Sequence, residues 1–293
     1  MDLRSIAERV LALPQVRFVL AVLDTYGKAP GGILANGLAF AALFSALPTT
    51  LLLLGIGGLV AQDAAFQAKL ATALAEAFPP LAGLFEDALA AVSQGAGIAS
   101  ILGLLGLVWG VSQFYSTLDL AFSRIFSDAP ERDFARRTLR GFVWVLVLVG
   151  ALLIVIILAG LSSFLDTLLP DRFGSMRSIR TVLASPLTIL VLGVVAVTIA
   201  YRVLPPSTPN WRSILPPAVL VGIAITLLTQ LFTALVPFLV GAAAIAGSLA
   251  SAFVALAWLS FSFQALLYGA SWVRVAELRA AANDAAAGEA AAT

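Results

Sequence analysis

The chain has 293 residues, of which 61% are hydrophobic and 11% are charged, and its mean hydropathy is +1.02. A soluble domain must cover its surface with polar groups, so this composition excludes an ordinary water-soluble protein. Because cysteine and histidine are both absent from the sequence, disulfides, thiolate nucleophiles, imidazole bases and the usual zinc ligands are excluded together. The formal net charge of +1 gives no basic excess, and we expect no nucleic-acid partner.

The N-terminal segment, residues 1 to 28, carries an apolar stripe beside charged residues. Val16, Val19, Leu20 and Leu23 recur at helical spacing. This pattern predicts an interfacial N-terminal helix, which either lies on the membrane surface or packs against the ends of the bundle.

Uncharged runs mark the predicted membrane helices, because one span needs about 20 apolar residues. The runs cover 29 to 62, 88 to 118, 141 to 165, 181 to 201 and 213 to 273. The last run holds two helices, and we place the turn between them at Pro237 to Gly247, where proline lacks a backbone donor and Gly241 and Gly247 weaken the helix. We therefore predict an all-α, polytopic membrane bundle within residues 1–279. Its six spans are 33–61, 97–120, 140–165, 181–203, 213–237 and 246–273.

Residues 64–94 are too polar to cross the membrane but keep a helical pattern. Apolar side chains recur every three or four residues on both sides of Pro79 and Pro80. We predict an amphipathic helical hairpin that either caps the bundle on the outer face or dips into the outer leaflet. The alanine-rich tail, 280–293, has few apolar anchors and is predicted to be disordered.

The distribution of Lys and Arg predicts the orientation, because basic flanks are retained on the cytoplasmic side. Most of the 17 basic residues lie in the N-terminal segment, the loops 119–140 and 202–212, and the tail. Lys69, Arg172, Arg177 and Arg180 lie on the other side. Both termini are therefore predicted to be cytoplasmic.

Few side chains inside the predicted spans are polar, and these are the candidates for a cavity or gate. Pro48, beside hydroxyl residues, predicts a kinked helix that either lines a cavity or packs with the hydroxyls bonded back to the same helix. Asp119 and Arg124 form either a cytoplasmic gate or an ion pair that anchors a helix end. The full set of candidates is Asn36, Ser45, Pro48, Thr49, Gln113, Asp119, Arg124, Gln230 and Gln264.

Gly106 and Gly110 place small residues on one face of the second span. Such a face permits close helix approach, either within one chain or in a dimer. The near absence of ionisable side chains within the spans argues against a proton-driven pump.

Four stretches resemble one family, the YihY/BrkB-like bacterial inner-membrane proteins that once carried a ribonuclease BN label. The stretches are Gly37 to Pro48, Ala121 to Phe126 with the basic Arg136 and Arg137, Tyr201 to Pro205 leading to Trp211 and Pro216, and Gly241 to Ala270 with Trp258. The resemblance implies a six-span protein of the bacterial cytoplasmic (inner) membrane, whose biochemical role is not settled.

Two functions are compatible with these residues. We expect transport or translocation of a lipid or of another amphipathic or neutral solute; the alternative is a non-transporting scaffold in envelope assembly. Expected partners are membrane lipids, together with further copies of the chain or envelope proteins. The spans hold no paired carboxylates, and the sequence has no phosphate loop or metal-binding motif, so we expect no enzyme, cofactor or metal. Ribonuclease activity is unexpected, because RNA hydrolysis usually requires histidines or clustered carboxylates.

Overall fold

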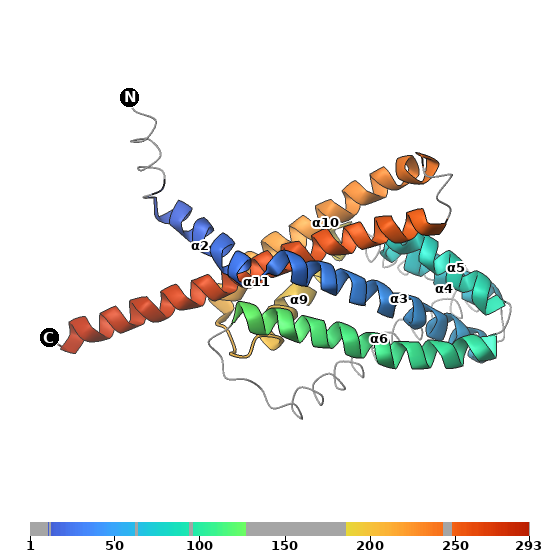
Figure 1. Ribbon diagram of the computed structural model, residues 1–293, viewed down its shortest axis with the longest axis horizontal. Coiled ribbons are helices and arrows are strands. Elements are labelled where there is room, and N and C mark those ends of the chain that lie inside the picture. The colour runs from blue at the N-terminus through green and yellow to red at the C-terminus, as the bar shows by residue number, and fades with distance from the viewer. Residues whose placement is uncertain are drawn as a thin grey trace, which may run out of the picture.

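The computed structural model describes residues 11, 13–61, 64–93, 96–126, 186–242 and 248–292. Every regular element within these ranges is helical (Figure 1), which confirms the all-α prediction for this part of the chain. The elements are α2 (Pro14–Lys28), α3 (Gly31–Ala61), α4 (Ala64–Ala77), the 3-10 turn η1 (Pro79–Leu81), α5 (Ala82–Ser93), α6 (Ala96–Ile125), α9 (Pro186–Val203), α10 (Trp211–Ala242) and α11 (Ser248–Ala292).

Three helices contain apolar stretches that are long enough to cross a membrane. These stretches are Gly31–Gly55 in α3, Trp211–Leu235 in α10 and Ala252–Ala290 in α11. The predicted spans 33–61, 213–237 and 246–273 coincide with these helices, 97–120 falls inside α6, and 181–203 overlaps α9. The predicted span 140–165 lies outside the described residues, so the count of six stays a prediction.

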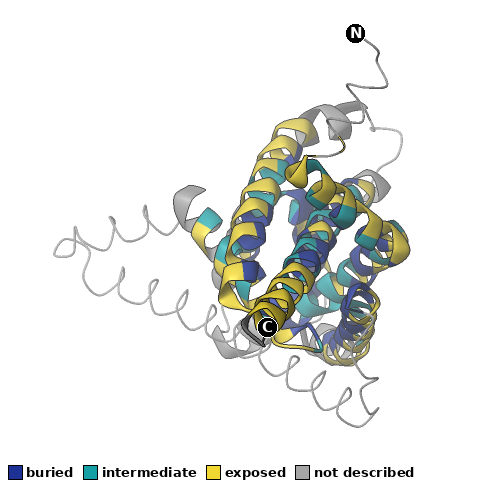
Figure 2. Ribbon diagram, turned by 90° about the vertical axis from the view of Figure 1, so that its left-hand side faces the viewer, coloured by how far each residue is buried: buried dark blue, intermediate teal, exposed yellow. Residues whose placement is uncertain are grey.

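The outward faces of the helices carry large apolar side chains. Ile33, Leu105, Leu227 and Phe253 are 75%, 65%, 64% and 68% exposed, although they belong to four different helices. Figure 2 shows buried residues where helices face one another and many exposed residues on the outside. Exposing apolar surface to water costs about 25 cal/mol per Å². This exterior therefore fits a hydrocarbon solvent, as expected of a membrane protein.

α3 and α6 lie side by side along much of their length (Figure 1). Their contact depends on glycines of α6: a Cβ atom added at Gly106 would lie 2.8 Å from Pro48 Cβ, and one at Gly110 would lie 2.9 Å from the Cα of Ser45. The small-residue face of α6 is thus occupied by α3 of the same chain. This finding favours packing within the chain over the dimer interface considered from the sequence.

α10 continues through Pro237 and ends at Ala242, and α11 begins at Ser248. The first of the two helices therefore ends beyond Pro237, in the later part of the stretch predicted to join them. A proline removes one backbone hydrogen bond, but an apolar helix loses more if it opens where water cannot satisfy the other backbone groups. α3 likewise continues through Pro48.

The tail is also different from its prediction, because α11 continues as a helix as far as Ala292. Residues 278–290 are all exposed, and this segment projects from the bundle (Figure 1). Alanine has the highest helix propensity of all residues, and a segment that continues an existing helix does not need a new nucleus. Helix propensity therefore outweighs the lack of apolar anchors in this segment.

α4 and α5 are joined by η1 and pack on one end of the bundle. Leu70 of α4 and Val92 of α5 are buried in a cluster with Leu54 of α3. η1 and α5 contribute Leu81, Leu84 and Phe85 to a second cluster, which includes Trp258 of α11. These contacts agree with the interpretation of this segment as a cap on the bundle.

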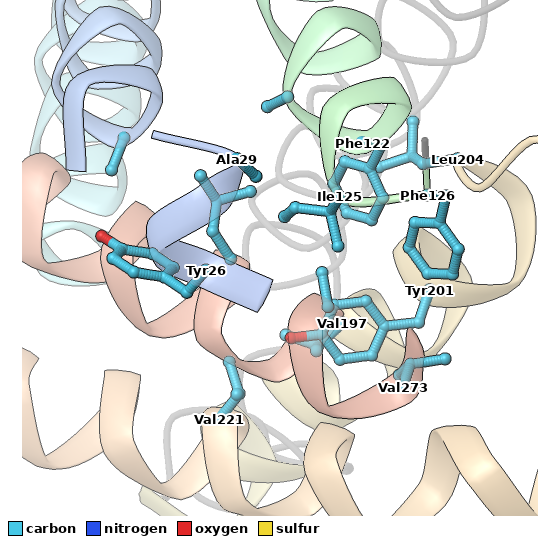
Figure 3. Packing of buried hydrophobic residues seen from close by; sticks show 14 of the residues in the cluster. Tyr26, Ala29, Phe122, Ile125, Phe126, Val197, Tyr201, Leu204, Val221 and Val273 are labelled. Atoms are coloured by element: carbon cyan, nitrogen blue, oxygen red, sulfur yellow. The ribbon is translucent and has the colours of Figure 1, made fainter. Parts of the chain in front are cut away.

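The other end of the bundle contains the largest buried cluster (Figure 3). Tyr201 of α9 lies beside Phe122 of α6 with 6.4 Å between ring centroids. Its hydroxyl donates a hydrogen bond of 2.7 Å to the carbonyl oxygen of Leu266 in α11. α2, which has proline at its first position, packs here through Tyr26, whose ring stacks on Tyr268 at 3.8 Å. With residues of α3 and α10 also in the cluster, six helices from distant parts of the sequence meet here.

Candidate functional site

α3 and α11 are joined by a chain of three uncharged polar side chains, which we call the amide–hydroxyl chain: Asn36, Ser260 and Gln264. The hydroxyl of Ser260 donates a hydrogen bond to Oδ1 of Asn36. Nε2 of Gln264 donates to Oγ of Ser260 over 3.4 Å. Ser260 and Gln264 are four residues apart and therefore share one face of α11. The structure thus brings together two of the predicted candidates, Asn36 and Gln264, through a serine that sequence reasoning missed.

The amide–hydroxyl chain lies at the edge of the protein core. Ala35 and Leu38, which flank Asn36 in the sequence, are fully buried, whereas Asn36 is exposed. Ser260 and Gln264 are half-buried. A side-chain amide has two N–H donors and a carbonyl acceptor, so Asn36 and Gln264 have hydrogen-bonding capacity beyond the bonds within the chain. The site can hold a polar, uncharged group without any ionisable residue.

A second polar contact joins α10 and α11. Nε1 of Trp258 donates a hydrogen bond of 3.1 Å to Oγ1 of Thr229. The predicted candidate on α10 was the next residue, Gln230, which is exposed and takes no part in this hydrogen bond. The signal in the sequence was Trp258, because a buried indole N–H usually has an acceptor.

The candidates around Pro48 form a packed helix seam. The hydroxyl of Ser45 donates to the carbonyl of Ala42 over 2.9 Å, and that of Thr49 donates to the carbonyl of Ser45 over 2.6 Å. Gly106 and Gly110 of α6 press against the same turn. Hydroxyls that bond back to their own helix satisfy the backbone near a proline. The structure therefore favours the packed kink over an opened helix at this position.

The three candidates on α6 do not form one site. Gln113 and Arg124 are exposed, whereas Asp119 is buried with 6% exposure. The five-residue separation of Asp119 and Arg124 places them on different sides of the helix. The gate and the anchoring ion pair considered for these two residues stay predictions.

Three arginines near the Tyr201 end lie over aromatic rings, and these pairs were not predicted from the sequence. The guanidinium of Arg202 lies 5.2 Å from the ring centroid of Trp211. The corresponding distances are 5.9 Å for Arg274 over Phe126 and 4.6 Å for Arg279 over Phe18. A carboxylate joins this end too, since Glu277 Oε1 accepts a 2.9 Å hydrogen bond from the backbone N–H of Asn210. Aromatic faces attract cations, and each pair links two segments of the chain.

Comparison with known proteins identifies the family. The family model described as Virulence factor BrkB matches residues 22–293. Searches of curated proteins and of solved structures gave no significant match. The family model covers all the helices described above except the first turns of α2. The chain therefore belongs to the BrkB virulence-factor family of membrane proteins, as the resemblance of its sequence motifs indicated.

Proposed function

We propose that this protein is a multi-pass protein of the bacterial cytoplasmic membrane that translocates a lipid or another amphipathic or neutral molecule. The observation that carries the proposal is the amide–hydroxyl chain, which is located between two helices of membrane-spanning length and is open at Asn36.

Polar side chains at such a position have an energetic cost. An amide within hydrocarbon needs hydrogen-bonding partners, because lipid chains provide none. Asn36 and Gln264 have hydrogen-bonding groups that are not used within the amide–hydroxyl chain. A transported molecule with hydroxyl, ester or amide groups would therefore find both donors and acceptors there. Asn36 lies in the uncharged run 29 to 62 and Gln264 in the uncharged run 213 to 273, so no formal charge within these runs selects an ion there.

The charges at the ends of the described helices support the proposed orientation. Arg124, Arg202 and Arg274 lie at the Tyr201 end, whereas Glu86 and Asp87 belong to the hairpin at the other end. Retention of basic flanks in the cytoplasm supports a cytoplasmic Tyr201 end and cytoplasmic termini. A topology reporter fused after Thr293 tests this assignment: we expect a cytoplasmic signal, and a periplasmic signal would contradict it.

The transport proposal is tested with the purified protein in lipid vesicles that contain fluorescent lipids in both leaflets. An impermeant quencher then reports how fast lipids exchange between leaflets. We expect the wild type to accelerate exchange and Gln264→Leu to slow it about tenfold, the effect of losing roughly 1.4 kcal/mol of hydrogen bonding. Asn36→Leu should have the same effect.

Gln230→Leu is the matched control, because Gln230 is an exposed glutamine outside the amide–hydroxyl chain. We expect it to retain the rate of the wild type. Equal losses for Gln264→Leu and Gln230→Leu would assign the effect to polarity in general. If neither lipids nor neutral solutes from a broad panel are moved by the wild type, the proposal is wrong.

One observation favours the alternative role as a scaffold, namely the exposed helical segment of α11 from 278 to 290. A helix that projects from the bundle is accessible to a protein partner in envelope assembly. Photo-crosslinkers placed in this segment in living cells should then recover one defined neighbour. If no crosslinked neighbour is recovered, the segment has no scaffolding role.

A further inference from the structure

α2 has two apolar faces, and the bundle covers one of them. The covered face contains Phe18, Val22 and Tyr26, which are four residues apart and therefore aligned on the helix. Phe18 meets Trp272 of α11 edge-on at 5.3 Å, and Tyr26 stacks on Tyr268. These contacts fix the rotation of α2 about its own axis.

The second apolar face is uncovered. Val19, Leu20 and Leu23 are 54%, 44% and 48% exposed. By helical geometry they occupy the arc next to the covered face, and Arg17, Asp24 and Lys28 occupy the remaining side. Since its contacts with α11 fix the rotation of α2, the uncovered arc cannot turn into the bundle.

The position of α2 indicates what covers this arc. α2 ends at Lys28, and the membrane-length stretch of α3 begins at Gly31, so the arc lies at the boundary of the membrane. Its supports on α11 are Trp272 and Tyr268, residue types that are enriched at the depth of lipid headgroups. Figure 1 shows α2 projecting obliquely from the end of the bundle. Lipid of the adjacent leaflet is therefore the nearest apolar phase.

Two exposed arginines lie on the helices that form this corner. Arg17 is on the wet side of α2, and Arg279 of α11 stacks on Phe18 at 4.6 Å. A guanidinium that stacks by its face keeps its N–H donors at the edge, where they suit phosphate oxygens. Within the described residues of α2, Lys28 and Asp24 form an ion pair at 2.6 Å, which involves neither arginine. The charge at this corner thus complements an anionic headgroup.

We propose that α2 is a membrane-docking helix that binds anionic phospholipid of the leaflet at the Tyr201 end. Val19, Leu20 and Leu23 enter the acyl region, and Arg17 and Arg279 hold lipid phosphates. This binding surface is separate from the amide–hydroxyl chain and does not depend on the proposed transport.

The depth of α2 can be measured cleanly because the sequence contains no cysteine. Spin labels are attached to Leu20→Cys, Leu23→Cys and, as the control on the wet side, Asp24→Cys, with the full chain in phosphatidylglycerol-containing nanodiscs. We expect oxygen to relax the first two labels more strongly than a water-soluble nickel complex does, and the reverse for Asp24→Cys. If all three labels favour the nickel complex, α2 is not in lipid. If the labels at 20 and 23 are shielded from both reagents, a protein or a second copy covers the arc, and the proposal is also wrong.

The headgroup contact is tested by native mass spectrometry of the protein with phosphatidylglycerol. We expect Arg17→Gln and Arg279→Gln each to weaken lipid retention about fivefold, as for one basic residue at an anionic surface. Arg212→Gln removes the same charge from the exposed start of α10 and should retain the lipid. An equal loss of lipid retention in all three variants would show general charge attraction and would overturn the specific site. The spin-label measurement of depth tests the apolar arc independently of this result.

Discussion

The two ends of the bundle are held by different kinds of contact. At the Tyr201 end, stacked aromatic rings, arginine–aromatic pairs and the bond from Tyr201 to Leu266 all have a defined direction. At the hairpin end, Leu81, Leu84 and Phe85 fill space against α10 and α11. Apolar contacts tolerate small shifts, but a hydrogen bond weakens steeply when its angle changes. Stability at the hairpin end therefore comes mainly from buried volume, although the bond from Trp258 to Thr229 contributes there too, whereas at the Tyr201 end it depends more on individual atoms.

The largest expected effect is Phe85→Ala at the hairpin end. Phe85 is 4% exposed, and truncating a buried phenylalanine typically costs about 3–5 kcal/mol through lost burial and the cavity left behind. Unfolding by denaturant in detergent micelles measures this loss. Glu86→Ala, a change at the next and exposed position, is the control and should have little effect. A loss below about 1 kcal/mol for Phe85→Ala would show that the hairpin packs only loosely.

A smaller effect is expected for Gly269→Ala at the Tyr201 end. A Cβ at this position would overlap the Tyr201 hydroxyl and would lie 2.6 Å from Cγ2 of Val221. Overpacking of this kind costs about 1–3 kcal/mol. Gly193→Ala is the matched control, since a Cβ there meets nothing within 4 Å.

The pair of changes Gly269→Ala and Tyr201→Phe sharpens the comparison. Because removing the hydroxyl relieves one of the overlaps, we expect the double variant to lose less stability than the sum of the single losses. If the stability losses of the two single variants add up to that of the double variant, the two residues are not coupled. The Tyr201 end would then not depend on contacts between individual atoms.

The smallest effect is expected for Tyr201→Phe alone. It removes the 2.7 Å bond to Leu266 while keeping the ring, and hydrogen bonds between membrane helices contribute about 0.6 kcal/mol on average. Thermal unfolding compared with the wild type measures the change. An unchanged midpoint would mean that packing of the ring alone holds α9 against α11.

The helical class and the positions of most described helices could be predicted from the sequence. Charged side chains are costly inside a membrane-spanning helix, so long uncharged runs mark where such helices lie. The uncharged run 29 to 62 corresponds to α3, and the run 213 to 273 contains parts of α10 and α11. The sequence also indicated that Gly106 and Gly110 permit close helix approach. The tail was predicted incorrectly because its lack of anchors was weighted above the helix propensity of alanine.

The candidate site was predictable in part. Polarity within an apolar run pointed to Asn36 and Gln264, but it pointed equally to Gln230. Which of two glutamines faces another helix depends on the rotation of α10 and α11 against their neighbours, and one sequence does not contain that rotation. Ser260 was missed for a related reason: a serine becomes informative only when its partner on another helix is known.

α11 is a single helix of 45 residues, roughly 68 Å long at 1.5 Å per residue, whereas the hydrocarbon core of a bilayer is about 30 Å thick. The same rigid rod therefore carries Ser260 and Gln264 in the bundle and the exposed segment beyond it. Geometry makes this rod a lever: a tilt of about 10° around Gly269 would move its far end by roughly 6 Å, given the rise per residue. A distance probe near Ala292 would thus magnify any rearrangement at the amide–hydroxyl chain into a readily measured displacement.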